Sequence, residues 1–182
     1  MEEIMKMSAP VPAQFDAENA SNLEDIEKQF AVKGQWCSRD PNLLTLTPAV
    51  SGLRVAVQHL ETYWSILKKV KGSSLRLTKM DDEIYEHLKA EFPEFDPAAT
   101  IDENELKSKT GKERWRKFMM AYDKRVDDYN FGTMLRTSPK VEYEQDTTIF
   151  VPRMQFYAVE IARNRAGLND WIYEKARAAA KA

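Results

Sequence analysis

The sequence predicts a mainly α-helical protein, a single compact domain of five to six helices around a central helix near the carboxyl end, with at most a small β-hairpin. Three observations lead to this fold class. Apolar residues recur at intervals of three and four in several segments, which is the period of an amphipathic helix. A serine or threonine followed three residues later by glutamate, which signals a helix start, stands before two of these segments. The range 152–166 is apolar on two sides, as expected of a buried helix.

The central helix is predicted over 152–166. At about 100° per residue, two opposite faces of this helix are apolar, and they carry Met154, Ala158 and Ile161 on one side and Phe156 and Val159 on the other. A helix with two apolar faces is usually buried, so the other helices are expected to pack against it.

Polar residues on this helix form a narrow stripe that contains Arg153, Glu160 and Asn164. Arg163 and Arg165 add two more guanidinium groups to a largely apolar segment. A buried guanidinium needs carboxylate or carbonyl partners. Two interpretations follow: either the arginines pair inside the domain, for example with Glu160, or they contact an acidic segment of a partner protein.

The amino-terminal part is predicted to begin with a flexible arm over 1–20, which is polar and has no helical period. A capping box then starts a helix over 22–33. The range 35–54 reads as a long loop, because prolines and a glycine interrupt every period. This loop holds the single cysteine, Cys37.

Two helices are predicted in the next part of the chain. Apolar residues at helical spacing predict the first over 54–70. Thr78 is the expected cap of the second, with Asp81 and Asp82 in its first turn, where carboxylates meet the positive end of the helix dipole.

The clearest helix follows a second capping box, formed by Thr110 and Glu113. Its apolar residues keep helical spacing as far as Val126 and Tyr129, so the helix is expected to end at about residue 130.

The carboxyl-terminal third adds short extended segments and a last helix. A brief strand or turn is predicted on either side of Pro139, over 133–136 and over 140–147, and an extended lead-in over 148–151 before the central helix. Gly167 is expected to end the central helix, and Asn169 to cap the last one. The final residues, 177–182, are expected to be a flexible tail.

Composition narrows the function classes. The formal charge of −2 gives no general reason to expect binding to nucleic acid or to an anionic membrane. No segment approaches the roughly 18 apolar residues of a membrane span, and the acidic amino terminus does not fit a signal peptide. A single cysteine fits a reducing compartment. We therefore expect a protein of the cytoplasm, with the nucleus as a second location, and without a membrane partner.

Motifs for catalysis are not found. The sequence has no glycine-rich nucleotide-binding motif, and His59 and His87 lie in different helices without a cysteine pair, which argues against zinc. Cys37 has no local histidine partner. The acidic pairs at 81–82 and 127–128 are more typical of helix caps or solvent-facing positions than of an acid and base. The sequence thus predicts no catalytic residue, no metal and no cofactor.

A run of basic residues over 112–117 surrounds Trp115, a pattern that also occurs in RNA-binding segments. Acidic residues nearby dilute its charge, so a solvated helix face is the favoured interpretation and direct nucleic-acid binding is not expected. An RNA-associated protein would bind with an affinity that falls steeply with salt.

Four collinear segments carry a resemblance to a known family. They read LRLTKMDDEIYEHL (75–88), ELKSKTGKERWRKF (105–118), VDDYNFGTMLR (126–136) and TIFVPRMQFYAVEIARNRAGLNDWIYEK (148–175). The chain resembles the eukaryotic polysaccharide biosynthesis domain-containing protein 1 family, in a form similar to fungal members. The resemblance implies a domain over 21–176 that holds newly synthesised translation elongation factor 1-alpha by its GTP-binding domain and has no catalysis of its own. The family's name leaves the alternative of an enzyme or accessory protein of polysaccharide biosynthesis.

The resemblance also implies a candidate partner-binding surface and an insertion. Positions carried over from the matching segments are Trp115, Arg116, Asp127, Tyr129, Asn130, Phe131, Gly132, Arg136, Arg153, Glu160, Arg163, Asn164 and Arg165. In the family a single long helix spans the positions that here flank about 34–54. This insertion is either a lineage-specific loop or unspliced coding sequence.

Overall fold

The structure is a computed structural model that describes residues 48–181. In chain order its elements are α2 (Pro48–Lys69), η2 (Gly72–Ser74), α3 (Asp81–Glu91), α4 (Glu103–Lys107), α5 (Lys109–Met120), β1 (Gly132–Arg136), η3 (Gln145–Thr147), β2 (Thr148–Pro152), α6 (Arg153–Arg165) and α7 (Asp170–Ala179). The predicted arm, the helix over 22–33, Cys37 and most of the insertion lie outside the described residues.

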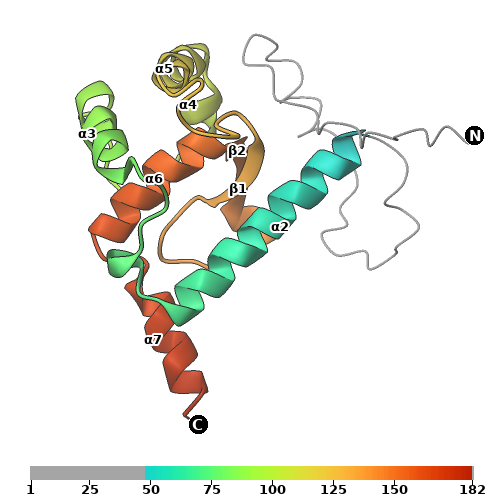
Figure 1. Cartoon of the computed structure of the whole chain (residues 1–182), viewed down its shortest axis with the longest axis vertical. Helices are drawn as coiled ribbons and strands as arrows, with labels where there is room; N and C mark the ends of the chain where they lie inside the picture. Colours follow the sequence, from blue (N-terminus) through green and yellow to red (C-terminus); the bar gives the residue numbers. More distant parts are fainter. Residues whose placement is uncertain (1–47, 182) are drawn as a thin grey trace, which may run out of the picture.

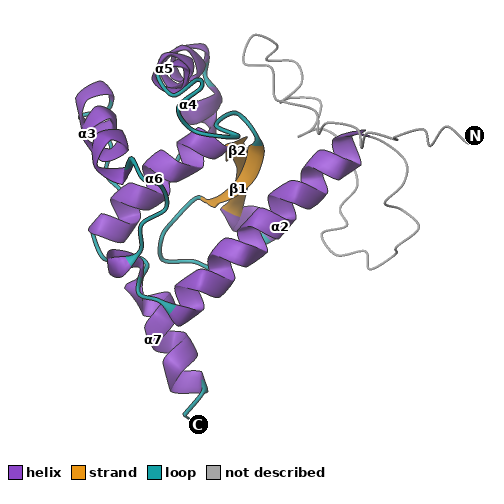
Figure 2. Cartoon of the chain, in the orientation of Figure 1, coloured by secondary structure: helices purple, strands orange, loops and turns teal. Residues whose placement is uncertain are grey.

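Helix α6 is the centre of the fold, as the sequence predicts. Ten of its thirteen residues are buried. Helices α3 and α5 contact it, as do η2 and both strands. Helix α2 runs along the other side of the strand pair and also contacts α7 (Figure 1). The described part is mainly helical with one pair of strands, which confirms the predicted fold class (Figure 2).

The two strands are short and antiparallel. Gly132 pairs with Pro152 and Arg136 pairs with Thr148 at the two ends of the ladder. The segments predicted over 133–136 and 148–151 therefore form strands, whereas 140–147 forms turns and η3. Pro152 ends β2 and is also the residue from which α6 starts, a place where its missing N–H is not needed.

Gly167 ends α6 as predicted. Its φ is +69°, which favours glycine, and its N–H donates to the Asn164 carbonyl (3.0 Å) while the Leu168 N–H donates to the Arg163 carbonyl (3.0 Å). These two bonds form a Schellman motif, which turns the chain directly into α7. Helix α7 continues to Ala179, so it includes the first residues of the predicted tail.

The start of α2 is earlier than predicted. The helix begins at Pro48, in a range predicted as loop because of Pro48 and Gly52. Proline is tolerated in the first turn, where the backbone N–H has no helical partner. A Cβ at Gly52 would meet nothing within 4 Å, so no contact forces a break there.

Helix α5 also differs from its prediction at both ends. Its cap is Ser108, whose Oγ accepts from the Gly111 N–H (3.0 Å), so the predicted box at Thr110 is wrong. The helix ends at Met120, about ten residues early. Lys124 and Asp128 have φ values of 63° and 58°, which are incompatible with a continuing helix. Apolar spacing continues through these turns, and that misled the prediction.

Candidate functional site

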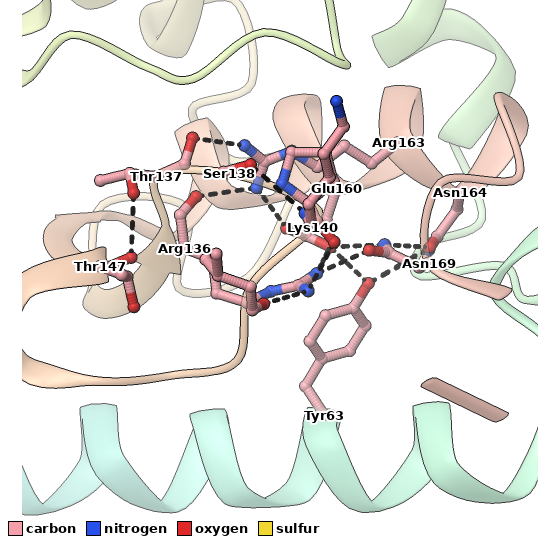
Figure 3. A network of polar contacts seen from close by, with 12 residues as sticks. Tyr63, Arg136, Thr137, Ser138, Lys140, Thr147, Glu160, Arg163, Asn164 and Asn169 are labelled. Carbon is pink, nitrogen blue, oxygen red and sulfur yellow. Dashed lines mark hydrogen bonds and ion pairs between the residues drawn. The ribbon is translucent and has the colours of Figure 1, made fainter. Parts of the chain in front are cut away.

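A fully buried ion triad lies where α6 meets β1. Glu160 on α6 accepts from Arg163 Nη1 (2.9 Å, Oε1) and from Arg136 Nη2 of β1 (3.3 Å, Oε2), and all three side chains are 0% exposed. Figure 3 shows the carboxylate between the two guanidinium groups. With two cations and one anion, the triad itself carries an excess positive charge.

Neutral side chains complete the coordination of the carboxylate. The Tyr63 hydroxyl of α2 donates to Glu160 Oε2 (2.9 Å), and Asn169 Nδ2 donates to the same oxygen (2.8 Å). Asn169 Nδ2 also donates to Asn164 Oδ1 (2.7 Å), and Asn169 Oδ1 accepts from Arg136 (2.6 Å). Asn169 stands at the start of α7 as predicted, but its side chain makes no cap bond. It joins the buried network instead.

Gly72 shows how closely η2 approaches this network. A Cβ added there would lie 2.7 Å from Asn164 Oδ1 and 2.9 Å from Asn169 Cβ, closer than real Cβ contacts. Glycine is therefore the residue that lets η2 cover the amide groups.

Backbone carbonyls and aromatic rings accommodate the extra positive charge. Arg136 Nη1 donates to the carbonyls of Pro139 (3.3 Å) and Val141 (3.2 Å). Arg163 donates to the carbonyls of Arg136 (2.8 Å) and Thr137 (3.0 Å). These four carbonyls belong to β1 and the segment after it, so the arginines fix the connection between the strands.

The Arg136 guanidinium also lies against two aromatic rings. Its Cζ is 5.5 Å from the ring centroid of Trp64 and 5.5 Å from that of Tyr143. Desolvated cation–π contacts of this kind stabilise a buried cation.

Tyr63, Trp64, Tyr143 and Asn169 were not predicted as site residues. Tyr63 and Trp64 lie in the helix predicted over 54–70. The one feature of the sequence that could have pointed to this site is a tyrosine beside the apolar positions of that helix.

Protonation states in the triad follow from these contacts. Burial disfavours the charged form of Glu160, but Arg136 and Arg163 outweigh it and lower the pKa of this carboxyl, which is ionised at neutral pH. Burial and the Glu160 carboxylate raise the pKa of Tyr63, so its phenol stays protonated and donates. A carboxylate held in this way, without solvent access, is a structural group rather than a proton donor to a substrate.

His59 on α2 lies against the other end of α6. Its Nδ1 is 2.6 Å from Thr133 Oγ1, and its ring meets Phe156 edge to face at 4.9 Å. Burial, and secondly the charge of Arg153, lower the pKa of His59 to about 4. The imidazole is therefore neutral across the physiological range.

A pH dependence of stability is expected from His59. Because its pKa is lower in the folded chain than the ordinary 6.5, the unfolded chain binds the proton first, and the free energy of unfolding should fall as pH decreases from 6.5 towards 4. Urea unfolding at pH 7 and pH 5 measures this change, and NMR titration of the ring gives the pKa directly. A His59→Gln variant should show a smaller difference between the two pH values. A ring that titrates near pH 6.5 in the folded protein would contradict this assignment.

The predicted partner-binding residues divide by burial. Six of the thirteen are buried and do not belong to the accessible surface, which corrects the expectation that they form it: Trp115, Gly132, Arg136, Glu160, Arg163 and Asn164. Their polar members form the network described above. The other seven are half-buried or exposed: Arg116, Asp127, Tyr129, Asn130, Phe131, Arg153 and Arg165.

Five of these seven gather at one place, which we call the turn surface: Asp127, Tyr129, Asn130, Phe131 and Arg153. The backbone fixes it, because the Arg153 N–H donates to the Phe131 carbonyl (2.6 Å) and the Met154 N–H donates to the Tyr129 carbonyl (2.8 Å). The Arg153 side chain adds an ion pair with Asp128 (3.3 Å), and its Cζ lies 5.9 Å from the Phe131 ring centroid. The turn is thus held against the first residues of α6.

All three arginines of α6 pair inside the domain. Arg163 binds Glu160, Arg153 binds Asp128, and Arg165 binds Asp82. The internal pairing that the sequence left as one of two interpretations is therefore present. Arg153 and Arg165 remain partly accessible, with 12% and 36% of their side-chain surface exposed.

The remaining sequence features have structural uses. Asp81 accepts from the backbone N–H groups of Leu77 (2.9 Å) and Thr78 (2.6 Å), and so fixes the segment before α3. The N-cap of α3 is Met80, which makes no side-chain cap bond, so the predicted cap at Thr78 is wrong. In the basic run, Arg114 pairs with Glu94 and Lys117 with Glu91. In residues 48–181, no three His, Cys, Asp or Glu side chains are placed to share a metal ion. None of the helices there is both long and apolar enough to cross a bilayer.

Comparison with known proteins gives consistent matches. A profile described as PBDC1 protein matches residues 53–174. The chain is 53% identical over 161 residues to the protein PBDC1 homolog of Saccharomyces cerevisiae, and 54% identical over 162 residues to that of Schizosaccharomyces pombe. Each match covers 87% of this chain and 95% of the relative. Human protein PBDC1 is 43% identical over 118 residues, which is 65% of this chain and 50% of the human protein.

A solved structure agrees with the fold. The solution NMR structure of a Saccharomyces cerevisiae protein with 53% sequence identity matches with a TM-score of 0.63. The match covers 88% of this chain and 97% of the other.

Proposed function

The chain belongs to the PBDC1 family, and on that premise we propose that it is a non-catalytic, chaperone-like binding protein for newly synthesised translation elongation factor 1-alpha. It holds the factor's GTP-binding domain through the turn surface, in the cytoplasm and, as a second location, the nucleus. The observation that carries this proposal is the exposure of aromatic and charged side chains on a backbone that is held in strained turns.

The strain supports a binding role. Lys124 and Asp128, both non-glycine residues, adopt left-handed φ values just before and within the turn surface. Such conformations cost on the order of 1 kcal/mol each and persist where the surrounding structure holds them, often at binding sites. Here Arg153 holds Asp128, and two backbone bonds hold the turn on α6. A partner then meets a preformed surface and little ordering entropy is lost on binding.

The side-chain types also suit a protein partner. Tyrosine, phenylalanine and arginine are enriched at the energetic centres of protein interfaces. Tyr129, Phe131 and Arg153 supply one of each, all partly accessible, and the exposed Asp127 adds a charge at the edge. Edge charges mainly steer association and select the partner.

A pull-down tests the proposal. Tagged protein is incubated with a eukaryotic lysate, and elongation factor 1-alpha is expected to be enriched over an unrelated helical protein of similar charge. Asp127→Lys should reduce this enrichment about tenfold or more, since it reverses an edge charge at the interface. The matched control is Glu61→Lys, an equally charged change at an exposed position of α2, which should leave the enrichment unchanged.

Both variants should keep the melting temperature of the unmodified protein, because both positions are exposed. Equal capture of elongation factor 1-alpha by the helical control would falsify the proposal. Calorimetric binding of a sugar nucleotide or a methyl donor would instead favour an enzyme of polysaccharide modification.

A further inference from the structure

A cleft of about 240 Å³ is lined by α4, by the first half of α5 and by the 92–102 connection between α3 and α4. Its inner wall is apolar and comes from three parts of the chain: Phe92 after α3, Trp115 on α5 and Val159 on α6, all buried. Phe92 and Trp115 stack at 4.3 Å between centroids. This volume is below the roughly 300–1,000 Å³ of a typical small-molecule site, so the cleft suits one large side chain better than a cofactor.

The walls of the cleft are preformed. The Ile101 N–H donates to the Thr137 carbonyl (2.9 Å), which ties the connection to the end of β1. On the other side, a Cβ at Gly111 would clash with the Glu105 carbonyl oxygen and lie 2.8 Å from that of Leu106. Glycine therefore allows α4 to pack tightly on α5 and form this wall.

The mouth of the cleft is acidic. Four carboxylates line it, from Glu94, Asp96, Asp102 and Glu105, against one guanidinium, from Arg114. Within the lining, four negative charges and one positive charge leave a formal charge of −3. Arg114 pairs with Glu94, and its Cζ lies 4.4 Å from the Phe92 ring centroid. The excess of carboxylates in the lining therefore favours cationic over anionic groups.

We propose that this cleft docks a short basic segment of a partner protein, with one large apolar side chain in the cavity and flanking lysine or arginine side chains at the acidic mouth. The apolar wall removes the central side chain from water, which is the main favourable contribution. The carboxylates accept charge-assisted hydrogen bonds from the flanking residues and select basic over acidic segments. The cleft borders the start of α5, whereas the turn surface follows its end, so the two surfaces are distinct.

NMR titration with synthetic pentapeptides tests this docking on the full chain. The probe is capped Arg-Lys-Leu-Lys-Arg, and the comparison peptides replace the central leucine by glycine, the basic residues by glutamate, or the basic residues by glutamine. The basic leucine peptide should move the Trp115 indole and Gly111 amide signals. The glycine, glutamine and glutamate peptides should each bind at least about fivefold more weakly, a loss of about 1 kcal/mol. Equal binding of the glutamate peptide, or shifts confined to other surfaces, would overturn the proposal.

Variants at exposed positions locate the site. Glu105→Lys should weaken binding of the basic peptide at least about fivefold, and Ala99→Trp should block the cavity and remove the shifts. If the lysine variant does not fold, Glu105→Gln replaces it in the titration, because it removes the negative charge and hardly changes the size of the side chain. Glu113→Lys, at an exposed position of α5 outside the lining, is the matched control and should change affinity less than about twofold. Binding that survives both cleft variants would exclude this site.

The titration contains no elongation factor, so its failure would leave the proposed function untouched. Likewise, a pull-down that fails while the peptide still binds would leave the cleft assignment intact.

Discussion

Replacement of Glu160 by glutamine is expected to destabilise the folded chain by about 3–5 kcal/mol, the loss that follows removal of one partner from a buried ion pair. Arg136 and Arg163 would remain buried without their counter-ion and would repel each other. Urea unfolding at pH 7 measures the change. For a chain of this size, the melting temperature should fall by roughly 6–20 °C.

Two controls separate the charge from the substitution itself. Glu86→Gln removes an exposed carboxylate that pairs with Lys89 on α3, and it should change stability by less than about 0.5 kcal/mol. The second control is pH. Because the folded chain lowers the pKa of Glu160, the stabilisation is complete above the unfolded pKa and is lost as pH falls through the folded pKa. The difference between Glu160→Gln and the unmodified protein should therefore shrink in acid. A constant difference from pH 7 to pH 2 would contradict the ionised triad.

Replacement of Phe118 by alanine is the second large expected effect, again about 3–5 kcal/mol. Phe118 is 0% exposed and lies in an aromatic cluster. Its ring stacks on His87 at 4.4 Å and meets Trp115 and Tyr122 at 5.5 Å each. Alanine would leave a cavity that these rigid rings cannot fill. The folded chain would therefore lose the free energy gained by removing the Phe118 ring from water, and the empty cavity would destabilise it further. Denaturant unfolding with an unchanged m-value would show a loss of stability without a change of fold.

Met120→Ala is the matched control for Phe118→Ala. Met120 lies two residues further along the same helix and is 52% exposed, so its replacement should stay within about 0.5 kcal/mol. Similar losses for the two variants would mean that helix propensity, rather than core packing, sets the stability of α5.

The central helix α6 could be predicted because its signals are local. The two apolar faces of 152–166 and the glycine at 167 lie within one short stretch, and the structure confirms both. The end of α5 could not be predicted in the same way. Val126 and Tyr129 keep the helical spacing of apolar residues, whereas the left-handed backbone of Lys124 and Asp128 leaves no pattern in the sequence.

The site was predicted only in part, for a different physical reason. Charged residues in a family motif suggest an exposed surface, because an isolated charge is costly to bury. Arg136, Glu160 and Arg163 are nevertheless buried, since each meets the others through tertiary contacts between β1 and α6. Asn169 was placed correctly at the start of α7, but its use in the network depends on tertiary contacts with Arg136 of β1 and Glu160 of α6. Asp127 is exposed and Phe131 is half-buried, so both remain candidate positions for partner binding.

The buried network also constrains the order of folding. Tyr63 reaches Glu160 and Asn164 across separations of 97 and 101 residues, and Asn169 is the last member in the chain. Contacts this distant in sequence close slowly, because a long loop must be closed before they form. During its own translation, helix α2 leaves the ribosome long before the carboxylate that it binds has been made. Tyr63 of the nascent chain therefore lacks its buried carboxylate partner until α6 has been made, and the domain completes this network in a late, cooperative step.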